Sequence, residues 1–434
     1  MSIAADGRRV GKPAPFRLVA CYFATALASW IVAMLVVTAA APQLAAAEAT
    51  APRVLLSVHL VALGFLPLAV TGAAFHVLPT LLRNGVSTIR GWAALPLLCA
   101  GPFLALGIAN DRSSLIWPAA TAETAGFVVV AWELMAMVVR APRGRMLLAS
   151  RAGVLLSTFH AAAALAFGAA LAAREWRPIL GIPHDRAIAI HLDLAVLGWL
   201  TLLIVTVGRT LAPMLALAPA AARRRFPGTE LALTAGLWLL VAGLAFGGRA
   251  LVAAGGLVAF GAVATFAVLT ARVSREHRLD GVEGPLLHLA TGLFFLGQAT
   301  LLGLALALGM KVTVPRLAAY VIALLLGWAA GVTLGHLGKL LSLSAWTWWP
   351  PGPRPKQAVL YPRRVWVIEA VAFAIGCELL LNGALVGSER TVQLGGVLLA
   401  TSAALACLAA LVTFRAGVPA LARRASGGAP QPVP

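Results

Sequence analysis

Apolar residues occur along this chain in long runs that are almost free of charge, and polar residues are confined to short connections between the runs. A helix that crosses the hydrocarbon of a bilayer needs about 20 mostly apolar residues. The backbone inside the hydrocarbon must bond internally, so each run is expected to be an α-helix. We therefore predict an all-α polytopic membrane protein with about 12 transmembrane helices. The predicted ranges are 16–41, 54–82, 90–109, 115–139, 150–173, 187–215, 229–248, 250–271, 284–309, 316–343, 366–387 and 392–415.

Composition agrees with this class of protein. Hydrophobic residues make up 61% of the chain and charged residues 11%, whereas a soluble domain carries about 25% charged residues. The longest polar connection, 344–365, is too short to form a soluble domain. The four cysteines fall in four different helices, so no disulfide framework is expected. The tail 426–434 (SGGAPQPVP) is predicted to be disordered.

The net charge of +19 suggests a nucleic-acid partner at first, but the distribution of Lys and Arg argues against one. Of 34 such residues, 23 fall in segments on the same side as the N-terminus and nine in the opposite loops. This asymmetry is the positive-inside bias of membrane proteins. It predicts a multi-pass protein of a bacterial-type inner (plasma) membrane, with cytoplasmic N- and C-termini and the lipid bilayer as its surroundings.

The second, sixth and tenth predicted helices share a sequence pattern. Each contains Leu-Gly followed by an aromatic residue, at Leu63–Phe65, Leu197–Trp199 and Leu326–Trp328. The copies are 134 and 129 residues apart, which is four helices each time. This repeat predicts three duplicated four-helix units within one membrane domain. Their ranges are 1–145, 146–278 and 279–425, followed by the tail 426–434.

Histidines fall at two depths in these helices. His59 and His191, near the outer starts of helices 2 and 6, are named the outer layer, and the inner layer comprises His76, His288 and His336. At about 1.5 Å per residue the two layers are roughly 20 Å apart. Neutral imidazole inside a membrane suits heme iron and copper, so all five are predicted to bind a cofactor, with His59 and His191 as metal ligands. The alternative is that each ring is hydrogen-bonded between helices as part of the packing.

Five further ionisable residues are predicted inside the helices and are candidates for the same site. Asp193 is the counterpart of His59 in the repeat, and Arg209 and Lys339 are cations that could meet heme propionates or extend to the membrane surface. Glu123 and Glu133 are buried carboxylates and candidate proton carriers.

The remaining polar residues have weaker expectations. Glu378 is a further candidate proton carrier, whereas Glu369, near its helix start, is expected at the membrane interface. His160 is expected near mid-membrane, and His184 and His277 in loops. Helices 3, 7, 8 and 12 are predicted to contain neither histidine nor carboxylate and to form lipid-facing walls.

The arrangement of 12 helices in three four-helix arcs, with histidines on helices 2, 6 and 10, is similar to the catalytic subunit of heme-copper oxidases and nitric oxide reductases. It also resembles the NnrS family of bacterial nitric oxide stress. The stretches 59–82, 191–215 and 336–346 carry the resemblance. The resemblance implies a heme b ligand at His59 and a copper ligand at His191.

The chain departs from the oxidase pattern at two places. Helix 10 should begin with two histidines, but Tyr320 and Ile322 stand in that neighbourhood, and helix 7 lacks the expected histidine pair. A complete oxygen-reducing centre is therefore not expected, and no catalytic residue is assigned.

The function predicted from the sequence is binding of heme, copper or both by a divergent non-oxidase member of this superfamily, in respiration-linked or nitric-oxide-stress physiology. Two alternatives remain open: a transporter of a small solute or metal, and a non-catalytic assembly partner of a respiratory complex that contacts its subunits. No phosphate loop or hydrolytic motif is present in the sequence.

Overall fold

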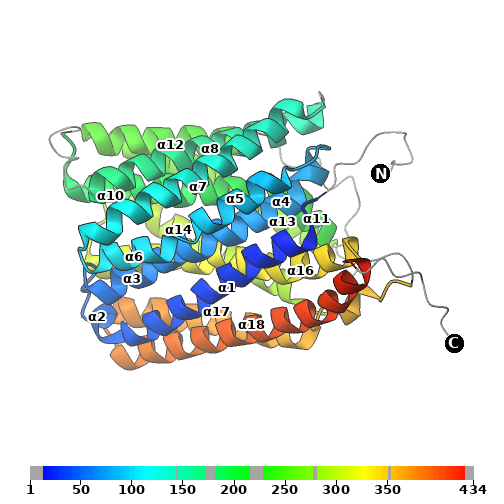
Figure 1. The fold of residues 1–434 in the computed structure, drawn as a ribbon. Coiled ribbons are helices and arrows are strands. Elements are labelled where there is room, and N and C mark those ends of the chain that lie inside the picture. The colour runs from blue at the N-terminus through cyan, green and yellow to red at the C-terminus, as the bar shows by residue number, and fades with distance from the viewer. Residues whose placement is uncertain are drawn as a thin grey trace.

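The computed structural model describes residues 13–142, 145–172, 181–215, 228–276, 281–349 and 353–425. These residues form helices and no strand, and 12 of the helical spans are long and apolar enough to cross a membrane. The helices lie roughly parallel in one bundle (Figure 1). The prediction of an all-α polytopic membrane protein is thereby confirmed, while the tail 426–434 and His277 lie outside the described residues.

The elements follow one another with short connections. The first six spans are built from α1 (Phe16–Ala39), α2 (Ala41–Ala45), α3 (Pro52–His59), η1 (Leu60–Phe65), α4 (Leu66–Leu81), α5 (Thr88–Leu98), α6 (Gly101–Ala109), α7 (Ser113–Arg140), α8 (Arg145–Ala172), α10 (His184–Asp193), η2 (Leu194–Thr201) and α11 (Leu202–Leu215). The last six are built from α12 (Thr229–Phe246), α13 (Arg249–Arg275), α14 (Gly284–Ala307), α15 (Val314–Val321), η4 (Ile322–Ala330), α16 (Gly331–Thr347), η5 (Gln357–Val359), α17 (Arg363–Val386) and α18 (Glu389–Ala425).

Two helical hairpins in the bundle turn through a left-handed glycine. Gly247 ends α12 at φ 75° and Gly387 ends α17 at φ 71°, a conformation that a residue with a side chain adopts only with strain. The paired helices then pack closely, because a Cβ on Gly255 would lie 2.5 Å from the backbone nitrogen of Leu240. Small residues at such crossings let membrane helices approach one another and gain van der Waals contact.

The second, sixth and tenth spans form the centre of the bundle. Of their most apolar stretches 61%, 61% and 72% is buried, against 28% for the fifth, eighth and ninth spans. The eighth span is thus among the most exposed, and its role as a lipid-facing wall stays a prediction. The fifth and ninth are equally exposed although they carry His160 and His288, because each turns only one face toward the centre.

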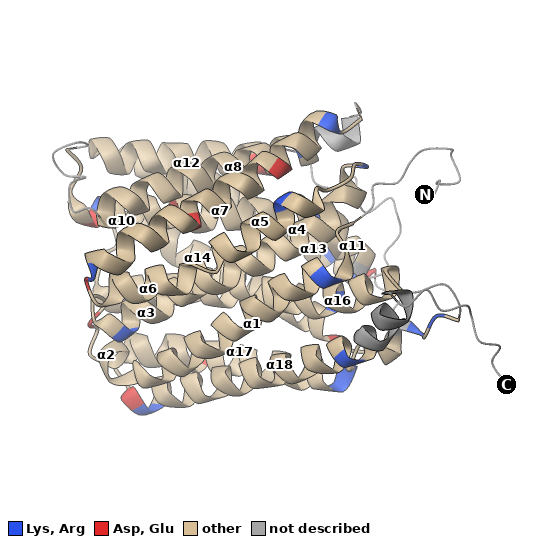
Figure 2. Ribbon diagram, viewed as in Figure 1, with Lys and Arg blue, Asp and Glu red and all other residues tan. Residues whose placement is uncertain are grey.

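Charge is confined mainly to the two ends of the bundle (Figure 2). The start of α1 and the end of α18 lie at the same end, as an even number of spans requires (Figure 1). The long middle of the helices exposes apolar side chains instead, among them Leu257, Trp132 and Val128. This distribution suits a surface surrounded by lipid, and the cytoplasmic location of the termini stays a prediction.

Candidate functional site

The Leu-Gly-aromatic pattern lies in a π-helical turn in each of its three copies. Leu63–Phe65 falls in η1, Leu197–Trp199 in η2 and Leu326–Trp328 in η4. π-helical turns are rare and occur frequently at functional sites. The three central helices therefore share an unusual backbone feature as well as a sequence pattern. The division of the chain into three units stays a prediction.

The glycine of each copy packs against the span that precedes it. A Cβ would come within 3.0 Å of Ser29 at Gly64, of His160 at Gly198 and of Phe295 at Gly327. A larger residue at any of the three would force the neighbouring helix to shift. The close approach thus fixes the first and second helices of each predicted unit against each other.

In both imidazoles of the outer layer Nδ1 bonds to a backbone carbonyl, within the same span for His59 and on the fifth span for His191. Nδ1 of His59 lies 2.8 Å from the carbonyl oxygen of Leu55, and Nδ1 of His191 lies 2.9 Å from that of Ala164. A carbonyl only accepts, so Nδ1 carries the proton in both rings and Nε2 keeps its lone pair. Both rings are half-buried. The second and the sixth span therefore each carry one oriented imidazole with a nitrogen donor available.

Asp193, which follows His191 closely in α10, is bonded to the tenth span. Its carboxylate accepts a hydrogen bond of 3.1 Å from the Tyr320 hydroxyl. Eight residues further along both spans, Trp328 Nε1 donates to Thr201 Oγ1 at 2.9 Å. These two bonds tie the sixth and tenth spans together. Tyr320 thus pairs with a carboxylate at the position where the oxidase pattern would place the start of its histidines.

The inner layer does not form a single group. His288 Nε2 pairs with Glu369 Oε2 at 2.7 Å, and Ser402 donates to the other oxygen of Glu369 at 2.7 Å. His336 donates from Nδ1 to the Val332 carbonyl oxygen at 2.6 Å, and its Nε2 stays available as in the outer layer. His76, on the second span, is buried and its Nδ1 has no partner among the described residues.

Glu369, which is expected at the membrane interface, has a side chain that is completely buried between the ninth, eleventh and twelfth spans. Burial inside the bundle does not fix its depth in a membrane, so the interfacial position stays a prediction. Its partner histidine is 81 residues away in the sequence, and a position near a helix start gives no sign of that partner. A buried carboxylate needs such partners, since an unpaired one would be costly.

His160 has the opposite arrangement to the outer layer. Its Nε2 accepts a hydrogen bond of 3.1 Å from Trp238 Nε1 of the seventh span. That bond occupies the lone pair a metal would need, so His160 acts as a packing contact between helices. His184 begins α10 and is exposed, which places it at a helix start instead of in a loop.

The intramembrane cations are held by carboxylates. Arg209 pairs with Glu230 at 3.0 Å and Lys339 with Glu283 at 2.9 Å. Lys339 also lies 4.6 Å from the centre of the Tyr361 ring, a cation–π contact. Burial raises the pKa of the Tyr361 hydroxyl. The prediction that helix 7 contains no carboxylate is wrong, because Glu230 is its second residue and is buried against Arg209.

The two buried carboxylates of the fourth span differ in their surroundings. Glu133 accepts hydrogen bonds from the backbone nitrogen of Ser87 and from Arg90, so it joins α7 to the start of α5. Glu123 is 1% exposed and lies beside Gly101, where the third span is broken between α5 and α6. Glu133 therefore has a structural role, whereas neither oxygen of Glu123 has a hydrogen-bond partner within the part of the chain that the structure describes.

In the ranges that the structure describes, no three side chains of His, Cys, Asp or Glu converge as metal ligands. A metal held by these residues would therefore have two protein ligands at most from this set. The donor atoms fit such a group, because His59, His191 and His336 each combine an oriented ring with an available Nε2.

Comparison with known proteins adds no further constraint. Neither a protein-family model nor a curated protein matches the chain. The function must therefore be argued from the arrangement of these side chains inside a polytopic membrane protein.

Proposed function

We propose that this membrane protein binds heme b, copper or both inside its helical bundle through intramembrane histidines, with His59 and His191 as the principal ligands. The observation that carries the proposal is the pair of Nδ1–H bonds to backbone carbonyls. Metal-binding histidines commonly donate their second ring N–H to a carbonyl or carboxylate, which orients the ring and selects the tautomer. Both outer-layer rings have this arrangement.

The intramembrane histidines differ in their hydrogen bonds, and this difference supports the choice of ligands. His160 uses its Nε2 as a hydrogen-bond acceptor, and a packing histidine is expected to do so. His336 leaves Nε2 available on the most buried span and is a further candidate ligand, whereas His288 is engaged by Glu369. His76 completes the candidates, with an unpartnered Nδ1.

A bound heme or copper would supply electron exchange or binding of a small molecule such as nitric oxide. The chain's own residues would hold the group and shield it from water. Helix 7 supplies no histidine and Tyr320 is bonded to Asp193, so the proposal does not include a complete oxygen-reducing centre. A role in respiration-linked or nitric-oxide-stress physiology, and contact with respiratory subunits, belong to this proposal.

The visible spectrum of the purified protein tests the proposal. We expect a Soret band that shifts on reduction with dithionite, or copper found by metal analysis. His59→Gln and His191→Gln should each lose most of the bound group, because one of two ligands is removed. His184→Gln is the matched control, since that histidine is exposed and is the first residue of α10. Wild-type protein that is well folded, colourless and free of metal would rule the proposal out.

A further inference from the structure

A groove runs between α14 and α17 on the outside of the bundle. Its first part, of 560 Å³, is lined by residues that include Phe294, Phe295 and Ile375, and its second part, of 290 Å³, by residues that include Leu302 and Leu381. Phe294 is 56% and Ile375 49% exposed, so the groove opens toward the surrounding lipid. A molecule could therefore enter it from the bilayer without crossing the protein.

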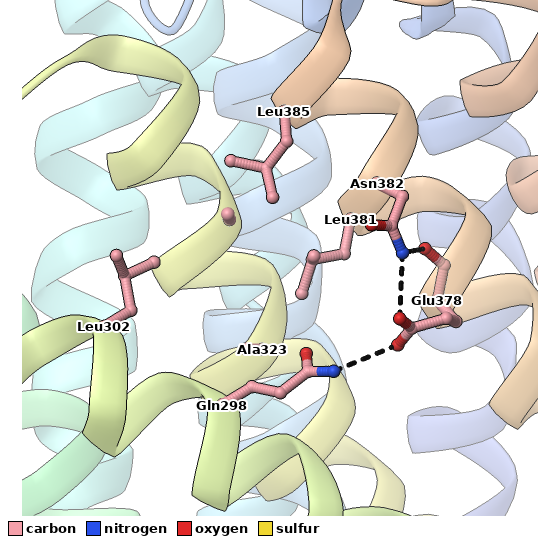
Figure 3. A pocket seen from close by; sticks show the side chains of 8 residues that line it. Gln298, Leu302, Ala323, Glu378, Leu381, Asn382 and Leu385 are labelled. Atoms are coloured by element: carbon pink, nitrogen blue, oxygen red, sulfur yellow. Dashed lines mark hydrogen bonds between the residues drawn. The ribbon is translucent and has the colours of Figure 1, made fainter.

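Glu378 lies where the two parts of the groove meet, and both parts are lined by it. Its two carboxylate oxygens accept amide hydrogen bonds, from Gln298 Nε2 at 3.3 Å and from Asn382 Nδ2 at 2.8 Å (Figure 3). Asn382 also donates to the backbone carbonyl of Glu378. A carboxyl group on an open membrane face is costly and is a functional hypothesis by default.

The polar atoms of this cluster call for a ligand that donates hydrogen bonds. Gln298 Oε1 is buried and has no partner among the described residues. The carboxylate of Glu378 accepts only two amide bonds and can accept more. Both amides turn their nitrogens toward the carboxylate, whereas a cation site would require oxygens directed at the ion. A hydroxyl group from the groove could donate to either acceptor.

The apolar lining indicates the rest of the ligand. Phe294 offers an exposed aromatic surface on one side of Glu378, where a flat ring can pack, and the buried Phe295 lies beneath it in the lining. Leu302, Leu381 and Leu385 offer aliphatic surface on the other side (Figure 3). Each pocket falls within or near the roughly 300–1,000 Å³ typical of small-molecule sites.

We propose that this groove binds a membrane-soluble hydroquinone, a hydroxyl-bearing ring on an aliphatic tail, through Glu378 and Gln298. The ring hydroxyl donates to the Glu378 carboxylate or to Gln298 Oε1, and the tail extends into the lipid. The proposal concerns binding and uses residues other than the intramembrane histidines. A failure of hydroquinone binding would therefore leave the proposed binding of heme or copper unaffected, and the reverse also holds.

The test is calorimetric titration of the full chain in dodecylmaltoside with decylubiquinol under anaerobic conditions, with empty micelles as the blank. We expect saturable binding of one molecule per chain. Glu378→Gln and Gln298→Leu should each weaken it about tenfold or more, the usual effect of losing a buried or charged hydrogen bond. Each variant must elute as wild type in gel filtration, and the second variant serves if the first does not fold.

Matched controls separate the groove from general effects. Glu389→Gln and Gln393→Leu make the same changes at exposed positions of α18 and should leave the dissociation constant unchanged. The 1,4-dimethyl ether of decylubiquinol keeps the ring and tail but cannot donate, and should bind at least about tenfold more weakly. Decanol should bind as weakly as the ether.

Four results would overturn the proposal. The first is the absence of saturable binding. The second is binding of the ether or of decanol as tightly as decylubiquinol, and the third is wild-type affinity in both Glu378→Gln and Gln298→Leu. The fourth is a disulfide cross-link between two copies through Leu379→Cys, which would show that a second chain covers the groove.

Discussion

Tyr320 of α15 donates its hydroxyl proton to the Asp193 carboxylate of α10, 3.1 Å away. The two residues are 127 positions apart in the sequence and belong to the two central spans that frame one side of the outer layer. A polar bond between helices in a membrane restricts how they can slide or rotate, because few alternative partners are available in lipid. The pair thereby holds the surroundings of His191 in place.

Removing this bond should weaken the protein measurably. We expect Tyr320→Phe to lower the free energy of unfolding by about 0.6–1.7 kcal/mol, the range found for hydrogen bonds between membrane helices. Unfolding in mixed micelles titrated with sodium dodecyl sulfate provides the measurement. A double-mutant cycle with Asp193→Leu isolates the pair. A coupling energy near zero would show that the bond adds nothing to stability.

Substitution of Glu369 should lower the free energy of unfolding more than Tyr320→Phe does, because the Glu369 side chain joins three spans. Glu369→Leu leaves the buried His288 and Ser402 without their acceptor, and we expect a loss of about 3 kcal/mol in the free energy of unfolding. Glu369→Gln keeps the shape and a hydrogen-bonding head, so its loss should be smaller. Ser402→Ala removes one bond only and should cost about 1 kcal/mol. Equal effects of the leucine and glutamine variants would contradict the assignment.

Gly335 provides a test of packing in the inner layer. A Cβ there would collide with the Cβ and ring of His288, so Gly335→Ala should destabilise the protein by about 1–3 kcal/mol. The matched control is Gly297→Ala on α14, where a Cβ would meet nothing within 4 Å. That control should be neutral or stabilising by up to about 1 kcal/mol, since alanine favours a helix. Similar unfolding curves for both variants would refute the close approach.

The orientation can be tested with reporter fusions. The positive-inside bias predicts that green fluorescent protein fused after Ala425 fluoresces and that alkaline phosphatase fused there is inactive. Fusions after Gly309, in the connection between α14 and α15, should behave in the opposite way. Active phosphatase at the C-terminal position would reverse the assignment of the outer and inner layers.

The spans could be predicted from the sequence because hydropathy and the length of the runs follow directly from the thickness of a bilayer. Within the described residues the structure has 12 such spans, at nearly the predicted positions. The π-helical turns could not be predicted, because the Leu-Gly-aromatic pattern marks a shared position and does not specify a backbone. The pattern still identified the three most buried spans.

The partners of the polar side chains were beyond the reach of the sequence. Glu369 and His288, or Lys339 and Glu283, are far apart along the chain, and only the packing of helices brings them together. Glu230 stands inside a predicted helix, and the intramembrane Arg209 is the sequence signal that a carboxylate lies near. The groove at Glu378 depends on the spacing between α14 and α17, which no local pattern encodes.

The π-helical turns also affect the phase of the central helices. A π turn bonds residues five apart instead of four, and therefore takes up one residue more than an α-helical turn. At 3.6 residues per turn, that residue rotates everything after it by about 100°. Compared with an unbroken α-helix of the same sequence, Lys339 on the tenth span therefore faces a different direction, the one in which Glu283 lies. In each central helix the two ends are thus rotated relative to each other, compared with an unbroken α-helix. The extra residue in the π-helical turn sets the direction of the side chains that follow it.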